Sequence, residues 1–187
     1  MTTTTLPEAA AAPTEAALRA LCVGEHPACF ACRPAAQGGL GLSFALQSDG
    51  SVSAGWTCPP GGESYAGIVH GGLLATALDS AMVHALFARG IVARTGELNV
   101  RFCESVRAGE PTAVTARLRE ARPPLFQLEA EIHQAGVLCA RANGKFMAGN
   151  RDDRAIPGLA GDPANLSRTG TVLEAGVVPS RHGEPRR

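Results

Sequence analysis

The middle of the chain contains one long apolar segment with helical spacing. Its apolar residues recur every three or four positions between Gly71 and Ala88, which predicts a helix. These residues are Leu73, Leu74, Ala77, Leu78, Ala81, Met82, Ala85 and Leu86. Gly90 follows and is expected to end the helix. Because this segment has few polar residues to expose to water, we expect the helix to be covered on most sides.

Alternating apolar and polar positions predict strands before and after this helix. Residues 40–47 and 52–58 alternate around the turn "SDGS", which predicts a hairpin. Four extended runs follow the helix: "TGELNVRFCE", "PTAVTARLREAR", "LFQLEAEIHQ" and "VLCARANGKFM". The connections between them are too short for crossover helices, so the sheet must be antiparallel. We therefore predict an α+β fold in which an antiparallel sheet of about six strands wraps around one long central helix.

The two ends of the chain lack the material for a packed core. Residues 1–25 are rich in Thr and Ala and contain a short helical pattern from Glu15 to Leu21, so we interpret them as an N-terminal arm. Residues 26–148 hold the predicted strands and form the domain. Residues 149–187 mix Gly, Pro, Asp, Arg and Ser, which predicts a flexible C-terminal tail.

Composition and charge narrow the classes of partner. A chain of 187 residues fits one domain with tails. Seventeen basic residues balance seventeen acidic ones, so no broad field should draw the protein to nucleic acid or to anionic lipid. The first residues form neither a secretory signal nor a bilayer-spanning stretch, and we expect a soluble, cytoplasmic protein without a membrane partner. The six cysteines show no disulfide framework, which favours reduced thiols.

Asp79 is the only acidic residue in the predicted helix. A carboxylate without a partner in apolar surroundings is costly or takes up a proton, and a raised pKa suits a general base or a nucleophile. The alternative is a structural role, in which Asp79 accepts hydrogen bonds from a neighbouring loop or from Thr76. The residues alone leave both interpretations open.

The helix is preceded by "HGG", formed by His70, Gly71 and Gly72. The first N–H groups of a helix have no partner within it, and glycine lets a carbonyl approach closely, so this start could form an oxyanion hole. A glycine loop needed only for a tight turn is the alternative. Gly71 and Asp79 are eight residues apart, which is roughly 12 Å along a helix axis. If both act on one bond, the acid must come from a second copy with an antiparallel helix, which predicts a dimer.

A second cluster of chemically active residues lies in "CVGEHPACFAC". Cys22, His26, Cys29 and Cys32 have spacings that suit zinc. The alternative is that the thiols pack as small apolar groups, and we favour it, so no metal and no cofactor is assigned.

Two further histidines are candidates for catalytic groups. His84 is five residues after Asp79, about 140° away around the helix, so the two side chains diverge. This disfavours a dehydratase or hydratase, which needs both on one substrate. His133 lies in a predicted strand and is interpreted as a surface or packed residue.

Four stretches together resemble the hotdog-fold acyl-CoA thioesterases of the phenylacetate-degradation (PaaI-like) type. They are "CFACRPAAQGGLGLSF", "GIVHGGLLATALDSAM", "TGELNVRFCESVRAGE" and "VLCARANGKFM", and the likeness covers about residues 29–147. Two positions depart from the pattern. Many relatives carry an acid at Ser80, and some carry an amide where this chain has Ser64 and Tyr65.

The resemblance implies a cytoplasmic homodimer or homotetramer that hydrolyses an acyl-CoA to the free acid and CoA. The N–H of Gly71 would polarise the thioester carbonyl, His70 would shape the loop, and Asp79 of the partner subunit would act as base or nucleophile. Thr95 matches the position of a hydroxyl that orients the attacking water, although a β-branched strand residue is expected there anyway. The alternatives are a non-catalytic acyl-CoA-binding hotdog protein and a hotdog enoyl-CoA hydratase.

Overall fold

The fold comes from a computed structural model, and the structure describes residues 11–148. Its elements in chain order are α1 (Glu15–Glu25), the 3-10 turn η1 (Ala35–Gln37), β1 (Ala45–Leu46), β2 (Val52–Thr57), β3 (Glu63–Tyr65), β4 (Ile68–Val69), α2 (Gly71–Phe87), β5 (Arg94–Phe102), β6 (Pro111–Arg122), β7 (Leu125–Gln134) and β8 (Val137–Met147). None of the helices in this range has the length and apolar character needed to cross a membrane.

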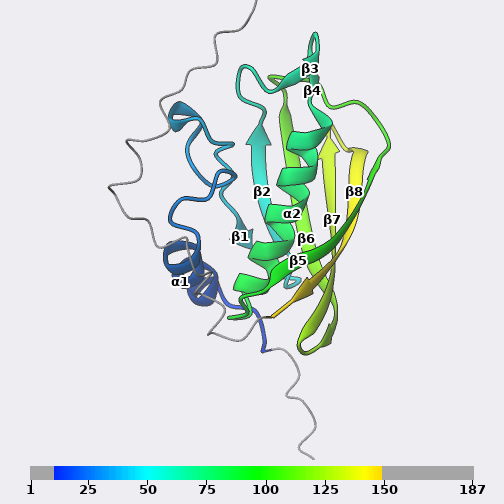
Figure 1. The fold of residues 1–187 in the computed structure, drawn as a ribbon. Coiled ribbons are helices and arrows are strands. Elements are labelled where there is room, and N and C mark those ends of the chain that lie inside the picture. The colour runs from blue at the N-terminus through cyan, green and yellow to red at the C-terminus, as the bar shows by residue number, and fades with distance from the viewer. Residues whose placement is uncertain (1–10, 149–187) are drawn as a thin grey trace, which may run out of the picture. The chain divides into compact units, whose positions relative to one another are not determined.

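The main sheet has six strands in the order β1-β2-β6-β7-β8-β5, and every neighbouring pair is antiparallel. Figure 1 shows α2 lying along one face of this sheet. The predicted α+β fold, with an antiparallel sheet around one long helix, is therefore confirmed. Two details differ from the prediction. The first strand is limited to Ala45–Leu46, and a small second sheet of β3 and β4 precedes α2.

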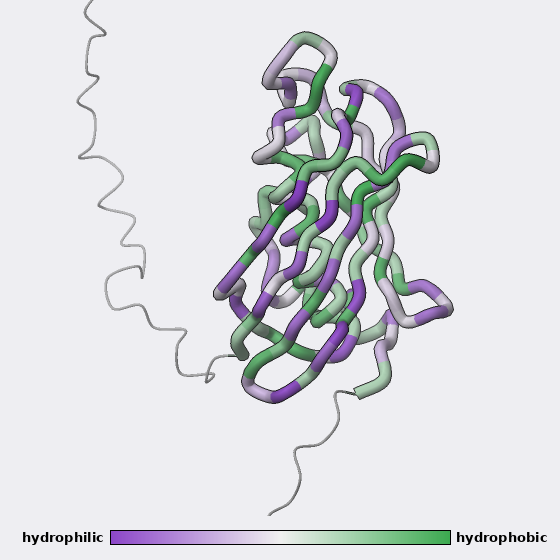
Figure 2. Tube along the Cα trace, turned by 90° about the vertical axis from the view of Figure 1, so that its right-hand side faces the viewer, coloured by the Kyte–Doolittle hydropathy of each residue, from purple (hydrophilic) through white to green (hydrophobic). Residues whose placement is uncertain are grey.

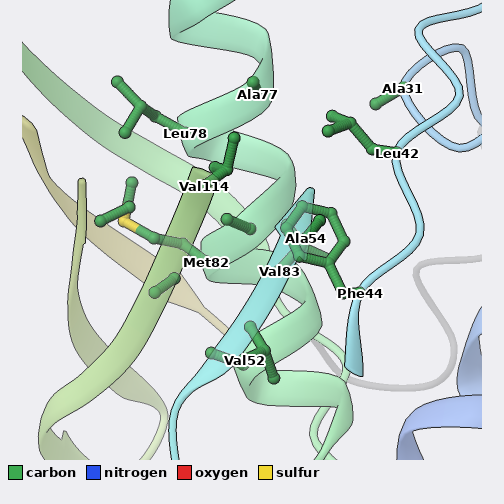
Figure 3. Close-up of a cluster of buried hydrophobic side chains, with 14 of the residues drawn as sticks. Ala31, Leu42, Phe44, Val52, Ala54, Ala77, Leu78, Met82, Val83 and Val114 are labelled. Atoms are coloured by element: carbon green, nitrogen blue, oxygen red, sulfur yellow. The ribbon is translucent and has the colours of Figure 1, made fainter. Parts of the chain in front are cut away.

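The core forms where α2 meets the inward-facing positions of the strands. β7 alternates between more exposed and buried residues along its whole length, and Figure 2 shows hydrophilic and hydrophobic positions alternating along the strands. Met82 and Leu78 of α2 point towards the sheet, where Val114 of β6 lies beneath them (Figure 3). Helix and sheet are so close that a Cβ atom at Gly144 of β8 would lie 2.9 Å from the Met82 sulfur.

The far side of α2 is covered by the segment that precedes β1. Ala31, Leu42 and Phe44 of this segment are buried and lie opposite α2 in Figure 3. The segment is held in place by the Trp56 indole, whose N–H donates to the Leu40 carbonyl at 2.9 Å. The sheet therefore does not cover α2 alone, because residues 31–44 supply the second wall.

Helix α1 packs against α2 and β1. The Thr14 hydroxyl caps α1 by accepting from the Ala17 N–H, and the fully buried Leu18 anchors it. The Glu15 carboxylate accepts from the Leu46 N–H at 2.9 Å. Of the predicted N-terminal arm, residues 11–25 thus include a packed helix. Residues 1–10 and the predicted tail 149–187 lie outside the described residues.

The connection from α2 to β5 positions the candidate site. Gly90 follows α2 with a φ of +71°, a left-handed conformation that glycine adopts without steric cost, and the chain then reverses direction. β5 is an edge strand of the main sheet. Its start lies beside the middle of α2, where the Thr95 hydroxyl reaches Asp79, and its end lies beside the start of α2, where Phe102 meets Gly71.

Candidate active site

Asp79 lies on the least covered face of α2. Gly72, Thr76 and Asp79 are spaced by four and three residues, so they share one face of the helix. Gly72 is exposed, and Thr76 and Asp79 are half-buried, whereas most of the helix from Ser80 onward is fully buried. The acid in the apolar helix is therefore at the border between core and surface.

Thr95 at the start of β5 contacts this acid directly. Its hydroxyl donates to the Asp79 carboxylate oxygen Oδ1 at 2.7 Å. The two residues are sixteen positions apart in sequence, and the reversal after α2 brings them together. Of the residues expected at the site, Asp79 and Thr95 thus meet within one protomer.

The environment of Asp79 favours its protonated form. Burial raises the pKa of the carboxyl above its ordinary value, while the hydrogen bond from Thr95 and the charge of His26 act in the opposite direction. Burial also lowers the pKa of the His26 imidazole, so that ring carries little charge near neutral pH. Desolvation therefore dominates at Asp79, which makes the carboxylate more basic than a free aspartate.

His70 caps the start of α2 with both its backbone and its side chain. Its ring Nδ1 accepts from the Gly72 N–H at 2.8 Å, which assigns the proton of the neutral ring to Nε2. Its carbonyl accepts from the Leu73 N–H at 2.9 Å and from the Leu74 N–H at 3.3 Å. Among the described residues, the Gly71 N–H is the one donor of this first turn without a recorded partner.

The Gly71 donor is bordered by an aromatic ring that the sequence analysis did not single out. A Cβ atom at Gly71 would lie 3.4 Å from the ring of Phe102, and Phe102 is 53% exposed in the single chain. Phe102 is the last residue of β5, whereas Thr95 is the second. One protomer therefore carries an acid at one end of β5 and a free N–H at the other.

Ser80 and His84 lie away from this face. Ser80 is buried, so an acid at its position would lie in the core and not on the exposed face that carries Asp79. His84 is 2% exposed, and its Nδ1 contacts the Ser80 carbonyl at 2.6 Å. His84 and Asp79 diverge as predicted, which argues against a hydratase that uses both.

The other polar residues considered in the sequence, Ser64, Tyr65 and His133, have no recorded contact with Asp79 among residues 11–148. Ser64 and Tyr65 lie in the exposed strand β3, and Tyr65 is 79% exposed. His133 is half-buried in β7, 4.0 Å from a Glu131 carboxylate oxygen. A hollow of about 450 Å³ lies away from Asp79, against strands β5, β7 and β8, and is lined by residues that include Arg101, Glu129, Glu131 and Arg141.

Comparisons with known proteins find similar sequences and folds among thioesterases. The sequence model of the thioesterase superfamily matches residues 66–140, which include β4, α2, β5, β6, β7 and the start of β8. No curated protein sequence matches the chain.

Two solved structures share 27% sequence identity with the chain. One is a thioesterase superfamily protein with a TM-score of 0.55. The match covers 57% of this chain and 55% of that protein. The chain thus spans about half the length of that protein. The other is a phenylacetic acid degradation-related protein from Ralstonia eutropha JMP134, also with a TM-score of 0.55, and here the match covers 62% of this chain and 91% of the other.

Two more distant structures share the fold. The PaaI protein from the phenylacetic acid degradation operon of E. coli is 18% identical with a TM-score of 0.62, and the match covers 73% of this chain and 96% of PaaI. A Streptococcus mutans protein bound to acetyl CoA is 15% identical with a TM-score of 0.55, with 58% of this chain and 89% of that protein covered.

Proposed function

We propose that this protein hydrolyses an acyl-CoA thioester to the free acid and CoA, because the thioesterase superfamily model matches residues 66–140 and these residues lie within a hotdog fold. The observation that carries the proposal is the half-buried Asp79 carboxylate, which accepts a hydrogen bond from the Thr95 hydroxyl on the least covered face of α2. A thioester already has a good leaving group, so one base and one oxyanion donor suffice for its hydrolysis.

In this mechanism Asp79 is the general base. The Thr95 hydroxyl occupies Oδ1, which leaves Oδ2 to accept a proton from water. The water oxygen bonds to the thioester carbonyl carbon, the carbonyl oxygen becomes an oxyanion, and the carbon–sulfur bond then breaks. The CoA thiolate leaves and takes up a proton. The raised pKa of Asp79 supports this role, because a more basic carboxylate accepts the proton of water more readily.

The oxyanion donor would be the Gly71 N–H. It points from a helix N-terminus, where the helix dipole favours negative charge, and the His70 cap leaves it available. Gly71 and Asp79 belong to the same continuous helix, so a rise of about 1.5 Å per residue separates them by roughly 12 Å. One protomer therefore cannot apply both groups to one carbonyl.

A second copy of the chain would complete the site. β5 is an edge strand of the sheet, and two such strands can pair antiparallel about a two-fold axis. That pairing brings the Thr95 end of one strand towards the Phe102 end of the other. Asp79 of one copy would then approach Gly71 of its mate. We therefore propose a homodimer, alone or within a homotetramer, with one composite site at each end of the interface.

A solved structure of the same fold supports CoA as the carrier of the acyl group. The Streptococcus mutans protein of the same fold is bound to acetyl CoA. In the proposed dimer the exposed ring of Phe102 would flank the carbonyl and offer an apolar wall to the acyl chain.

The test is release of free CoA thiol from short, long and aromatic acyl-CoAs by the wild type and by Asp79→Asn. Loss of the base should lower kcat by about 10²–10⁴-fold while acyl-CoA binding and the unfolding transition change little. Asp49→Asn is a matched control, because Asp49 lies in the β1–β2 turn and contacts Ser51.

Each alternative outcome has a separate meaning. Unchanged turnover of Asp79→Asn would exclude Asp79 as the base. A wild type that binds acyl-CoA without releasing thiol would favour the non-catalytic acyl-CoA binder. A monomer at assay concentration that still turns over substrate would exclude the composite site.

A further inference from the structure

A compact group of metal-ligating side chains follows α1, outside the site described above. The ligand atoms of His26, Cys29 and Cys32 all lie within 4.8 Å of one another. All three residues are partly buried, and both thiols are free. Cys22, the remaining member of the sequence pattern, lies within α1 and is not part of this group.

Helix α2 brings a further nitrogen beside Cys32, from His84, which is not one of the three residues whose ligand atoms all lie within 4.8 Å of one another. The His84 ring nitrogen Nε2 is 3.4 Å from the Cys32 sulfur. Around one tetrahedral zinc ion with usual bond lengths, a sulfur and a nitrogen ligand are about 3.6 Å apart. His84 and Cys32 are 52 residues apart in sequence, so only the fold brings them together.

The second nitrogen of His84 is arranged as in metal-bound histidines. Nδ1 lies 2.6 Å from the Ser80 carbonyl oxygen, which can only accept, so Nδ1 carries the proton and donates it. Nε2 then has a lone pair directed towards Cys32. A histidine that ligates a metal through one nitrogen usually donates the other N–H to a carbonyl or carboxylate in this way.

His26 supplies an independent observation. Its Nδ1 is buried and has no hydrogen-bond partner within residues 11–148. The ring is held between aromatic neighbours, with its centroid 4.7 Å from that of Phe87 and 5.7 Å from that of His84. A buried nitrogen without a partner destabilises the folded state, so a cation bound to it would remove a penalty that simple packing leaves in place.

We propose that His26, Cys29, Cys32 and His84 bind a structural zinc ion, which ties residues 26–32 to α2. Two thiolates and two imidazoles form a closed tetrahedral set with no open position, which is typical of structural rather than catalytic zinc. This assignment replaces the interpretation of the cysteines as packed apolar groups. The site would hold the face of α2 that carries Ser80 and His84, and none of its four ligands has an assigned role in the reaction at Asp79.

Zinc content and cobalt spectroscopy of the full chain test the proposal without any measurement of activity. We expect about one zinc per chain in protein purified without added metal. After chelation under reducing conditions, added Co²⁺ should give the thiolate charge-transfer and tetrahedral d–d absorption bands of a two-sulfur, two-nitrogen site. Cys29→Ser/Cys32→Ser should lose the zinc, whereas the control Cys103→Ser, which removes an exposed thiol, should keep it.

The role of His84 is tested by competition with a chelator. His84→Gln should weaken zinc binding by at least about tenfold, whereas Cys22→Ser should not. Zinc that persists in the double cysteine variant would overturn the proposal. So would a wild type that contains no zinc as purified and, after reduction, develops no cobalt–thiolate bands, whether Cys29 and Cys32 are isolated as thiols or as a disulfide. If the double variant fails to fold, the cobalt spectrum of the wild type decides.

Discussion

The hydrogen bond between Thr95 and Asp79 should influence how the rate of thioester hydrolysis depends on pH, and the size of this effect can be calculated. At 2.7 Å it stabilises the ionised carboxylate, so its removal by Thr95→Val should raise the pKa of Asp79 further. A hydrogen bond to a charged group contributes about 1.5–3 kcal/mol, and because Thr95 is exposed to solvent we discount this to about 1 kcal/mol. That energy corresponds to about a fivefold change in the ionisation equilibrium.

The sign of the effect follows from the proposed role of Asp79 as a base. Thioester hydrolysis needs the carboxylate, so kcat/KM should fall as pH drops through the pKa of Asp79. In Thr95→Val this acid limb should lie at higher pH, with kcat/KM on the limb about fivefold further below its own plateau than in the wild type. The assay is thiol release from one acyl-CoA across the acid and neutral range. A lower plateau would report the separate loss of water orientation.

Two controls isolate the hydroxyl. Thr95→Ser keeps the donor and should restore the wild-type limb. Thr115→Val changes a threonine of β6, which is three strands away from β5 in the sheet, and should leave the profile unchanged. A Thr95→Val profile that superimposes on the wild type after scaling by a constant would refute the electrostatic reasoning. A limb displaced to lower pH would refute its sign.

Two predictions concern the framework of the site. In Gly144→Ala the new Cβ atom would lie 2.6 Å from the Phe146 ring, so urea unfolding should show a loss of about 1–3 kcal/mol, whereas Gly55→Ala, with open space around it, should be nearly neutral. Equal stabilities would contradict the close approach of helix and sheet. In His70→Ala the cap on the Gly72 N–H is lost, which should lower the free energy of unfolding by about 1 kcal/mol in the same experiment. It should also lower kcat if the start of α2 frays. An unchanged unfolding midpoint would exclude the capping role.

The predicted dimer depends on the distance between Gly71 and Asp79, which could be calculated from their positions in the sequence. The separation of Gly71 and Asp79 follows from helix geometry alone. The structure adds that β5 is at the edge of the sheet and that its two ends lie beside these two residues. These observations together predict a dimer formed through β5, and sedimentation or small-angle scattering can test its presence in solution.

The sequence by itself was sufficient for α2 and for the four strands after it, and it singled out Asp79 as the candidate base. The helix at Gly71–Phe87 and the strands after it were predictable because side-chain periodicity is a local property of the chain. The same holds for the antiparallel sheet, since short connections exclude crossover helices. Asp79 stood out because a lone acid in an apolar helix has an energetic cost that can be read from its neighbours.

The tertiary structure alone decided which distant residues meet. Thr95 could be named from sequence as a strand residue, but its contact with Asp79 depends on how the chain reverses after α2. The contact of Cys32 with His84 depends on residues 26–44 crossing the far side of the same helix, which no periodicity encodes. Pairings over long sequence separations arise from the packing of whole elements. The local sequence pattern therefore determined which segments form helices and strands. Only the packing of these elements determined which side chains lie together in a site.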